Sequence, residues 1–239
     1  VKASPTPSVV LSESSGCELL TVTATESNGE GVEYLWTLPG GTQTNGITTG
    51  AVLLDDAGDH PFSVMVTGSN GCVAVANAIA EVFDAPTADF LINDVCEGTS
   101  TAFHDMSLQA GSQAIESWSW TFGDAEESME THPEHVYANA GTYTATLEVF
   151  DGRCVGVATQ TLEVFDAPSL TATSDVVEGC SPLLVSFDAV TEASAADVNW
   201  DFGDGNGAWG AATTHMYAGD SNVDVTYNVV ASVQNDEGC

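Results

Sequence analysis

Basic residues are almost absent from this sequence of 239 residues, which has Lys2 and Arg153 against 35 acidic residues. A chain with a net charge of −33 has almost nothing with which to neutralise phosphates, so nucleic acid and anionic membrane surfaces are excluded as partners. Apolar runs long enough to span a membrane are also lacking, so no membrane insertion is expected. Because 43% of the residues are hydrophobic, the chain should nevertheless fold around apolar cores.

Helical periodicity and zinc-type Cys-x-x-Cys spacing are lacking as well, which disfavours helical domains and zinc sites. Alternating apolar and polar residues predict strands instead. The clearest are residues 62–66, 116–122, 142–149 and 227–233. Several short strands per 80 residues, with turns between them, are typical of β-sandwiches. The sequence therefore predicts an all-β chain.

One short motif, Val-Phe-Asp-Ala-Pro, occurs at residues 82–86 and again at 164–168. The chain also shows the order Cys, Trp, Cys three times. The three sets are Cys17, Trp36 and Cys72; Cys96, Trp120 and Cys154; and Cys180, Trp200 and Cys239. This periodicity predicts three tandem repeats, residues 1–84, 85–166 and 167–239, the last without its final strand. We expect the sequence to be part of a larger protein.

Two cysteines at matching places in each repeat suggest three disulfides within the repeats, Cys17–Cys72, Cys96–Cys154 and Cys180–Cys239. Six cysteines allow fifteen pairings, so the sequence alone does not prove this one, but the periodicity favours it. In each repeat the second cysteine directly follows a predicted turn, so we expect the disulfides at one end of each sandwich. Disulfides imply an oxidising, extracellular setting.

Segments of the second and third repeats resemble the PKD domain family. They are Trp118–Asp124, His135–Tyr137, Asn199–Gly205 and His215–Tyr217. The resemblance implies seven-stranded, immunoglobulin-like β-sandwiches, as found in surface and secreted proteins. The first repeat also resembles a PKD domain, but a divergent one, because it lacks the Phe-Gly-Asp and His-x-Tyr motifs. The paired cysteines and the junction motif are similar in style to repeat adhesins secreted by Bacteroidetes.

The motif residues have roles in folding rather than in catalysis. The tryptophans are expected to fill the small cores, the glycines to allow a tight turn, and the aspartates to accept backbone N–H bonds in that turn. The full set is Trp36, Trp120, Phe122, Gly123, Asp124, His135, Tyr137, Trp200, Phe202, Gly203, Asp204, His215 and Tyr217. We expect no catalytic residues and no enzymatic activity.

Two candidate ligand sites remain in the third repeat. The oxygens of Asp201, Asp204 and Asn206 are spaced as in a calcium loop, but the closing glutamate of an EF-hand is missing and the fold motif already explains them. These residues are weak calcium candidates, and no other metal or cofactor is expected. Trp209 could be a platform for stacking sugars, or a loop tryptophan that covers the end of the sandwich.

Tandem sandwiches joined by a short proline-containing segment favour a structural function: an extended extracellular stalk or filament of a cell-surface adhesin. Its partners would be neighbouring repeats of the same protein, with self-association into fibres as a further possibility. The alternative is a set of accessory modules that bind polysaccharide or protein for a secreted hydrolase, because PKD domains accompany secreted chitinases and proteases.

Overall fold

The computed structural model describes residues 1–191, 195–219 and 223–239, and it is an all-β protein with sandwich-like sheets. Among these residues, no helix has the length and apolar character needed to cross a membrane. Two compact units can be distinguished. One comprises Val1–Leu91, Phe103–Pro133 and Ala145–Gln160, and the other Ile92–Ala102, Glu134–Thr144 and Thr161–Cys239. The repeat boundaries predicted above stay a prediction.

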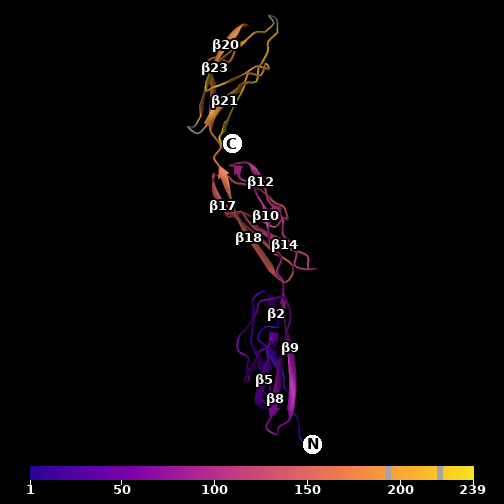
Figure 1. Ribbon diagram of the computed structural model, residues 1–239. Coiled ribbons are helices and arrows are strands. Elements are labelled where there is room, and N and C mark those ends of the chain that lie inside the picture. The colour runs from indigo at the N-terminus through magenta and orange to yellow at the C-terminus, as the bar shows by residue number, and fades with distance from the viewer. Residues whose placement is uncertain (192–194, 220–222) are drawn as a thin grey trace. The chain divides into compact units, whose positions relative to one another are not determined.

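The first repeat is organised around a five-stranded sheet with the order β2-β9-β8-β5-β6. Figure 1 labels four of these strands, β2, β5, β8 and β9. Two-stranded sheets β1-β4 and β3-β7 complete it. The elements are β1 (Val9–Leu11), β2 (Ser15–Cys17), β3 (Leu20–Val22), β4 (Ala24–Glu26), β5 (Gly31–Thr37), the 3₁₀ turn η1 (Pro39–Gly41), β6 (Gln43–Asn45), β7 (Val52–Leu54), β8 (Gly58–Gly68) and β9 (Val73–Phe83). β8 and β9 form a long antiparallel hairpin, whereas the short β2 pairs in parallel with the end of β9.

The second repeat has a five-stranded sheet of the same design, with the order β11-β18-β17-β14-β15. Its remaining strands form the pairs β10-β13 and β12-β16. The elements are β10 (Phe90–Leu91), β11 (Val95–Cys96), β12 (Ser100–Ala102), β13 (His104–Asp105), β14 (Ser117–Thr121), β15 (Glu127–Ser128), β16 (Glu134–Val136), β17 (Gly141–Phe150) and β18 (Val155–Phe165). As in the first repeat, a short strand pairs in parallel with the end of the last strand; here it is β11, which has two residues.

The third repeat contains two three-stranded sheets, β19-β20-β23 and β22-β21-β24. The elements are β19 (Leu170–Ser174), β20 (Leu183–Thr191), β21 (Ala195–Asp201), β22 (Gly207–Trp209), β23 (Ala212–Tyr217) and β24 (Val230–Asn235). The order β22-β21-β24 corresponds to β15-β14-β17 of the second repeat. In the part of the repeat that the structure describes, no strand takes the place of β11 or β18.

A buried tryptophan occupies the same place in each repeat, on β5, β14 and β21. Trp36 and Trp120 are 0% exposed and Trp200 is 2% exposed. Each indole Nε1 donates a 2.9 Å hydrogen bond to a carbonyl oxygen ten residues later, on Gly46, Glu130 and Gly210 respectively. The apolar ring is therefore buried without an unsatisfied N–H, and the Cys-Trp-Cys periodicity marks three equivalent cores.

One carboxylate, that of Glu26, is buried in the first repeat at 2% exposure. Its oxygens accept backbone N–H bonds from Ser8 at 3.2 Å, Asn28 at 3.0 Å and Gly29 at 2.7 Å. Burial raises the pKa of Glu26, but these backbone bonds outweigh it and hold the pKa below the ordinary value of a glutamate. The ionised side chain thus fastens the chain before β1 to the turn after β4.

We expect the change Glu26→Gln to lower the free energy of unfolding at pH 7 by about 1–3 kcal/mol, because it removes charge-assisted hydrogen bonds from a buried site. The folded-state pKa lies below the unfolded one, so the stabilisation is present above the ordinary pKa of glutamate and disappears as the pH falls through the folded value. Denaturant titrations between pH 7 and pH 3 would measure this. Glu81→Gln, at an exposed position of β9, is the control and should change stability little. Equal effects of the two changes would contradict the role of Glu26.

Candidate functional site: cysteine pairs between repeats

The PKD-like motif of the third repeat forms a connected aromatic and polar cluster. The His215 ring stacks on Phe202 with centroids 4.2 Å apart, and its Nε2 lies 2.8 Å from Asp204 Oδ2. Tyr217 donates a 3.0 Å hydrogen bond to the Phe202 carbonyl. The bond to His215 holds the pKa of Asp204 below its ordinary value. Asp204, His215 and Tyr217 therefore each have a hydrogen-bond partner close by in the fold.

The turn after Trp200 explains the glycine in this motif. Gly203 has a φ of +79°, and a Cβ there would lie 2.5 Å from the carbonyl oxygen of Asn228. Asp204 Oδ1 accepts the backbone N–H of Asn206 at 3.0 Å and so closes the turn. In the second repeat, Gly123 has a φ of +88° and Asp124 Oδ1 accepts the N–H of Glu126 at 3.1 Å.

The aromatic pair of this cluster also recurs in the second repeat. His135 and Tyr137 meet edge to face at 4.6 Å, as do His215 and Tyr217. Phe122 is buried at 2% exposure, like Phe202, and packs against Phe103. The sequence motif therefore corresponds to one turn and the aromatic residues packed against it, and this arrangement occurs in both the second and the third repeat.

The candidate calcium residues lie in this same turn. Asp201 Oδ1 accepts the N–H of Gly203 at 2.9 Å, so it and Asp204 both serve the local backbone. Among the described residues, no group of three or more His, Cys, Asp or Glu could hold a metal ion. Calcium binding by Asp201, Asp204 and Asn206 stays a prediction.

Trp209, the candidate sugar platform, lies on β22 and is 71% exposed. It pairs with Asn199, next to the buried Trp200. The corresponding positions are Asn45 beside Leu35 in the first repeat and Met129, which follows β15, in the second. An aromatic residue at this position is therefore confined to the third repeat.

The predicted disulfide pairing is wrong. The structure pairs Cys17 with Cys154 and Cys96 with Cys239, and it leaves Cys72 and Cys180 as free thiols. In both bonds the first cysteine of one repeat pairs with the second cysteine of the following repeat. The pairings Cys17–Cys72, Cys96–Cys154 and Cys180–Cys239 do not occur.

The sheet register explains why the two cysteines of one repeat cannot meet. Parallel pairing of β2 with β9 places Cys17 opposite Phe83, at the end of β9, whereas Cys72 directly precedes its first residue, Val73. Eleven residues of strand at about 3.3 Å each separate the two cysteines by about 36 Å. A disulfide requires Cα atoms within about 7 Å. In the second repeat, Cys96 lies opposite Phe165 at the end of β18, and Cys154 precedes the start of the same strand.

In the first two repeats the second cysteine lies at the tip of the long hairpin, and in the third repeat it lies after the turn that follows β24; similar hydrogen bonds hold it in all three. Its N–H donates to the side-chain oxygen of an Asn or Asp in the turn: Cys72 to Asn70, Cys154 to Asp151 and Cys239 to Asn235, at 2.7–2.9 Å. Its carbonyl oxygen accepts an N–H from the opposite side of the turn, that of Gly68, Asp151 or Asn235. Backbone and side-chain bonds therefore fix the three cysteines in the same way.

At the first junction, the hairpin tip of the second repeat contacts the end of the first. The Arg153 guanidinium lies over the Phe83 ring, 4.5 Å from its centroid. The Sγ atom of Cys154 is 3.9 Å from the Phe83 carbonyl oxygen, and Sγ of Cys17 is 3.4 Å from the Arg153 carbonyl oxygen. One of only two basic residues in the chain thus covers the aromatic residue of the Val-Phe-Asp-Ala-Pro motif.

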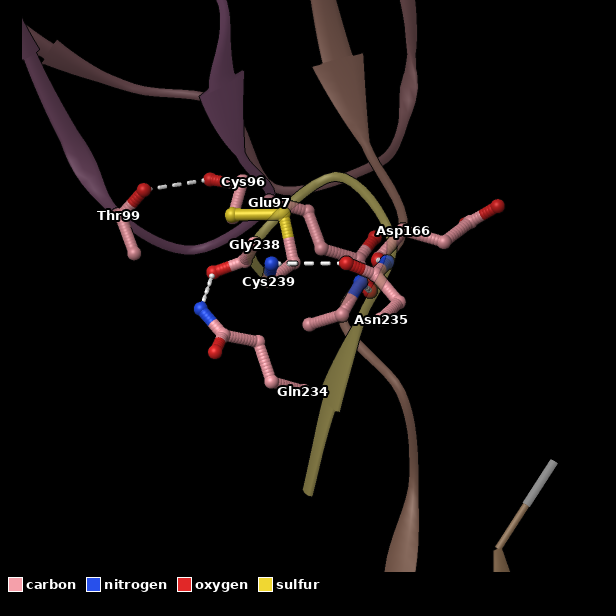
Figure 2. The surroundings of a disulfide bond; sticks show 9 residues. Cys96, Glu97, Thr99, Asp166, Gln234, Asn235, Gly238 and Cys239 are labelled. Carbon is pink, nitrogen blue, oxygen red and sulfur yellow. Dashed lines mark hydrogen bonds between the residues drawn. A yellow bond between two sulfur atoms is a disulfide. The ribbon is translucent and has the colours of Figure 1, made fainter. Parts of the chain in front are cut away.

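Figure 2 shows the second junction, where the Cys96–Cys239 disulfide joins β11 to the turn after β24. Asn235 holds this tip in two directions: its Oδ1 accepts the Cys239 N–H, and its Nδ2 donates to the carbonyl oxygen of Asp166 at 2.9 Å. Glu97, next to Cys96, accepts the N–H of Ala167 at 3.3 Å. The junction motif is thus bonded from both sides.

The residues that form these junctions include several that the sequence analysis did not select: Phe83, Glu97, Asn235 and Arg153. The sequence contains a signal for two of them: Phe83 belongs to the repeated motif, and Arg153 is one of only two basic residues. Both disulfide bonds of the described structure lie at these junctions.

Comparisons with known proteins agree with the motif. The sequence model of the PKD domain matches residues 83–165. A collagenase of Bacillus cereus is 41% identical over 51 residues, which are 21% of this chain and 5% of that protein, so the chain spans a small fraction of this relative. Among solved structures, the PKD1 domain of the Vibrio cholerae metalloprotease PrtV is 33% identical with a TM-score of 0.31, covering 34% of this chain and 96% of that one. The PKD1 domain of Vibrio anguillarum Epp is 29% identical with a TM-score of 0.33, covering 36% and 99%.

Thiol counting under denaturing conditions tests the pairing. We expect two reactive thiols in the unreduced monomer, three in Cys17→Ser, because Cys154 is released, and one in Cys72→Ser, the matched control. Pairing within repeats would instead give none in the parent chain and one in either variant. A colorimetric thiol assay in guanidinium chloride distinguishes the two patterns.

Proposed function

Residues 83–165 are a PKD domain in an extracellular chain of immunoglobulin-like β-sandwiches, and on this premise we propose that the chain is a non-catalytic structural segment. It forms an extended stalk or filament of a cell-surface, adhesin-type protein. The observation that carries the proposal is that both disulfides join successive repeats rather than closing each repeat on itself.

The position of the junction motif favours a load-bearing role. Val82–Pro86 lies inside the covalent loop closed by Cys17 and Cys154, and Val164–Pro168 lies inside the loop closed by Cys96 and Cys239. Each connection between repeats therefore has two covalent strands, the backbone and the disulfide. If a protease cuts the backbone within the motif, the disulfide still holds the two sides together.

Charge supports an extended arrangement. The three predicted repeats carry net charges of −9, −13 and −11. Like charges repel the repeats from one another at close range, and this repulsion acts over about 8 Å at physiological ionic strength. In self-association into fibres, the contacts between chains would have to be favourable enough to outweigh the same repulsion.

Small-angle X-ray scattering tests the stalk. Three sandwiches in a row, each about as long as the 36 Å of an eleven-residue strand, should give a radius of gyration of about 30 Å. A compact globule of 239 residues would have about 18 Å. The double variant Cys17→Ser/Cys154→Ser should broaden the distribution of distances, because one junction then has a single covalent strand. A radius of gyration near 18 Å for the parent chain would exclude a stalk.

The second candidate function is that of an accessory binding module, and the exposed Trp209 favours it. The relatives named above are a collagenase and a metalloprotease that contains a PKD1 domain. An accessory module predicts a strip of exposed aromatic side chains, whereas Asn45 and Met129 replace the tryptophan in the other repeats. The stalk is therefore the better supported function.

Binding to insoluble polysaccharide and to collagen separates the two functions. The stalk predicts no retention of the chain by chitin, cellulose or collagen, and the same result for Trp209→Ala. Retention by one of these polymers that falls at least tenfold in Trp209→Ala would favour the binding module. Trp209→Phe is the control, because it keeps an aromatic face at the same exposed position.

A further inference from the structure

The free thiol Cys72 lies in the same kind of turn as the bonded Cys154 and Cys239, and the free thiol Cys180 follows a glycine as the bonded Cys17 does, although Cys180 lies outside the strands. Cys72 lies at the hairpin tip with the same two backbone anchors as Cys154 and Cys239. Cys180 follows Gly179 as Cys17 follows Gly16. A Cβ at Gly179 would lie 2.5 Å from Leu183 Cδ1, and a Cβ at Gly16 would lie 2.7 Å from Leu20 Cδ1, so the two glycine–cysteine segments have the same packing four residues ahead.

A second, independent observation concerns the segment next to Cys72. Residues 1–5, Val-Lys-Ala-Ser-Pro, match the junction motif Val-Phe-Asp-Ala-Pro at the first and last positions. Asn70 Nδ2, in the tip, donates to the carbonyl oxygen of Ala3 at 2.6 Å. At the second junction, Asn235 Nδ2 donates at 2.9 Å to Asp166, which holds the same third place in the motif. The segment before the first repeat is thus bonded to the tip as a junction segment is.

The basic residues agree with this equivalence. Lys2 holds the second position of the motif, which Phe83 and Phe165 hold at the two junctions. Its Nζ donates to the carbonyl oxygen of Asn70 at 3.0 Å. Arg153 lies against Phe83 at the first junction. Both basic residues of the chain therefore connect a junction segment to a hairpin tip.

From these observations we infer that Cys72 and Cys180 are the two halves of one further disulfide junction, each taking a repeat of this same kind as its partner. Cys72 bonds the first cysteine of the repeat placed before it, and Cys180 bonds the second cysteine of the repeat placed after it. The result is a continuous disulfide ladder in which every repeat is bonded to both neighbours. The inference concerns assembly, and it does not depend on whether the assembled chain serves as a stalk.

Formation of this bond requires an oxidant. The proposed oxidant is a small disulfide such as oxidised glutathione. The thiolate of Cys180 attacks that disulfide, one glutathione thiolate leaves, and a mixed disulfide forms. The thiolate of the partner cysteine then attacks the protein sulfur of the mixed disulfide and releases the second glutathione. Two protein thiols lose two protons and two electrons, and one glutathione disulfide gains them.

Two single variants test the inference with a second copy of the full chain as the partner. Cys72→Ser keeps Cys180, and Cys180→Ser keeps Cys72. In a glutathione redox buffer we expect the equimolar mixture to form a cross-linked dimer of about twice 24.7 kDa on non-reducing gels, at least tenfold more than either variant alone. Peptide mapping should identify a Cys180–Cys72 bond, and the double variant should give no dimer. Symmetric dimers formed as readily by each variant alone would overturn the inference.

A longer chain tests a partner within the same polypeptide. A copy of residues 85–163 is placed directly before Val1, so that Val1–Pro5 becomes its junction segment. We expect Cys72 to bond the copied Cys96, leaving Cys180 and the copied Cys154 as thiols. A free Cys72, or a bond from Cys72 to the copied Cys154, would overturn the inference. Cross-linking in the mixture identifies a second copy as a competent partner, whereas the bond in the longer chain identifies an adjacent repeat.

Discussion

The length of one strand governs the covalent structure of this protein. In each of the first two repeats, the last strand along the chain is eleven residues long. One cysteine directly precedes its first residue, and the other lies in the short parallel strand beside its last residue. The two cysteines of a repeat are therefore kept about 36 Å apart. Each cysteine lies instead at an end of the sheet where the chain passes to or from a neighbour. Bonds between consecutive repeats follow from this geometry.

Much of the fold was accessible from the sequence. Alternation predicted the long strands, the Cys-Trp-Cys order marked three equivalent cores, and the PKD-like motif indicated the family and the sandwich. In the first two repeats the second cysteine directly follows a hairpin turn, as predicted. These features depend on short stretches of contiguous residues, for which periodicity and turn chemistry are strong signals.

The disulfide pairing could not be predicted in the same way. It depends on β2 and β11, strands of three and two residues that are too short to show any alternation. Their parallel pairing with β9 and β18 places Cys17 and Cys96 at the far end of each sheet. Periodicity identified equivalent cysteines, but it contained no information on whether equivalence meant bonds within a repeat or between repeats. The contact of Arg153 with Phe83 was beyond sequence reasoning for the same reason, because it joins residues 70 positions apart.

Mass spectrometry of the unreduced protein tests the bonds between repeats directly. Chymotryptic peptides separated without reduction should contain one pair linked through Cys17 and Cys154 and another linked through Cys96 and Cys239, each of which splits in two on reduction. A linked pair containing Cys17 and Cys72, or Cys96 and Cys154, would contradict the register of the last strand and the ladder that follows from it.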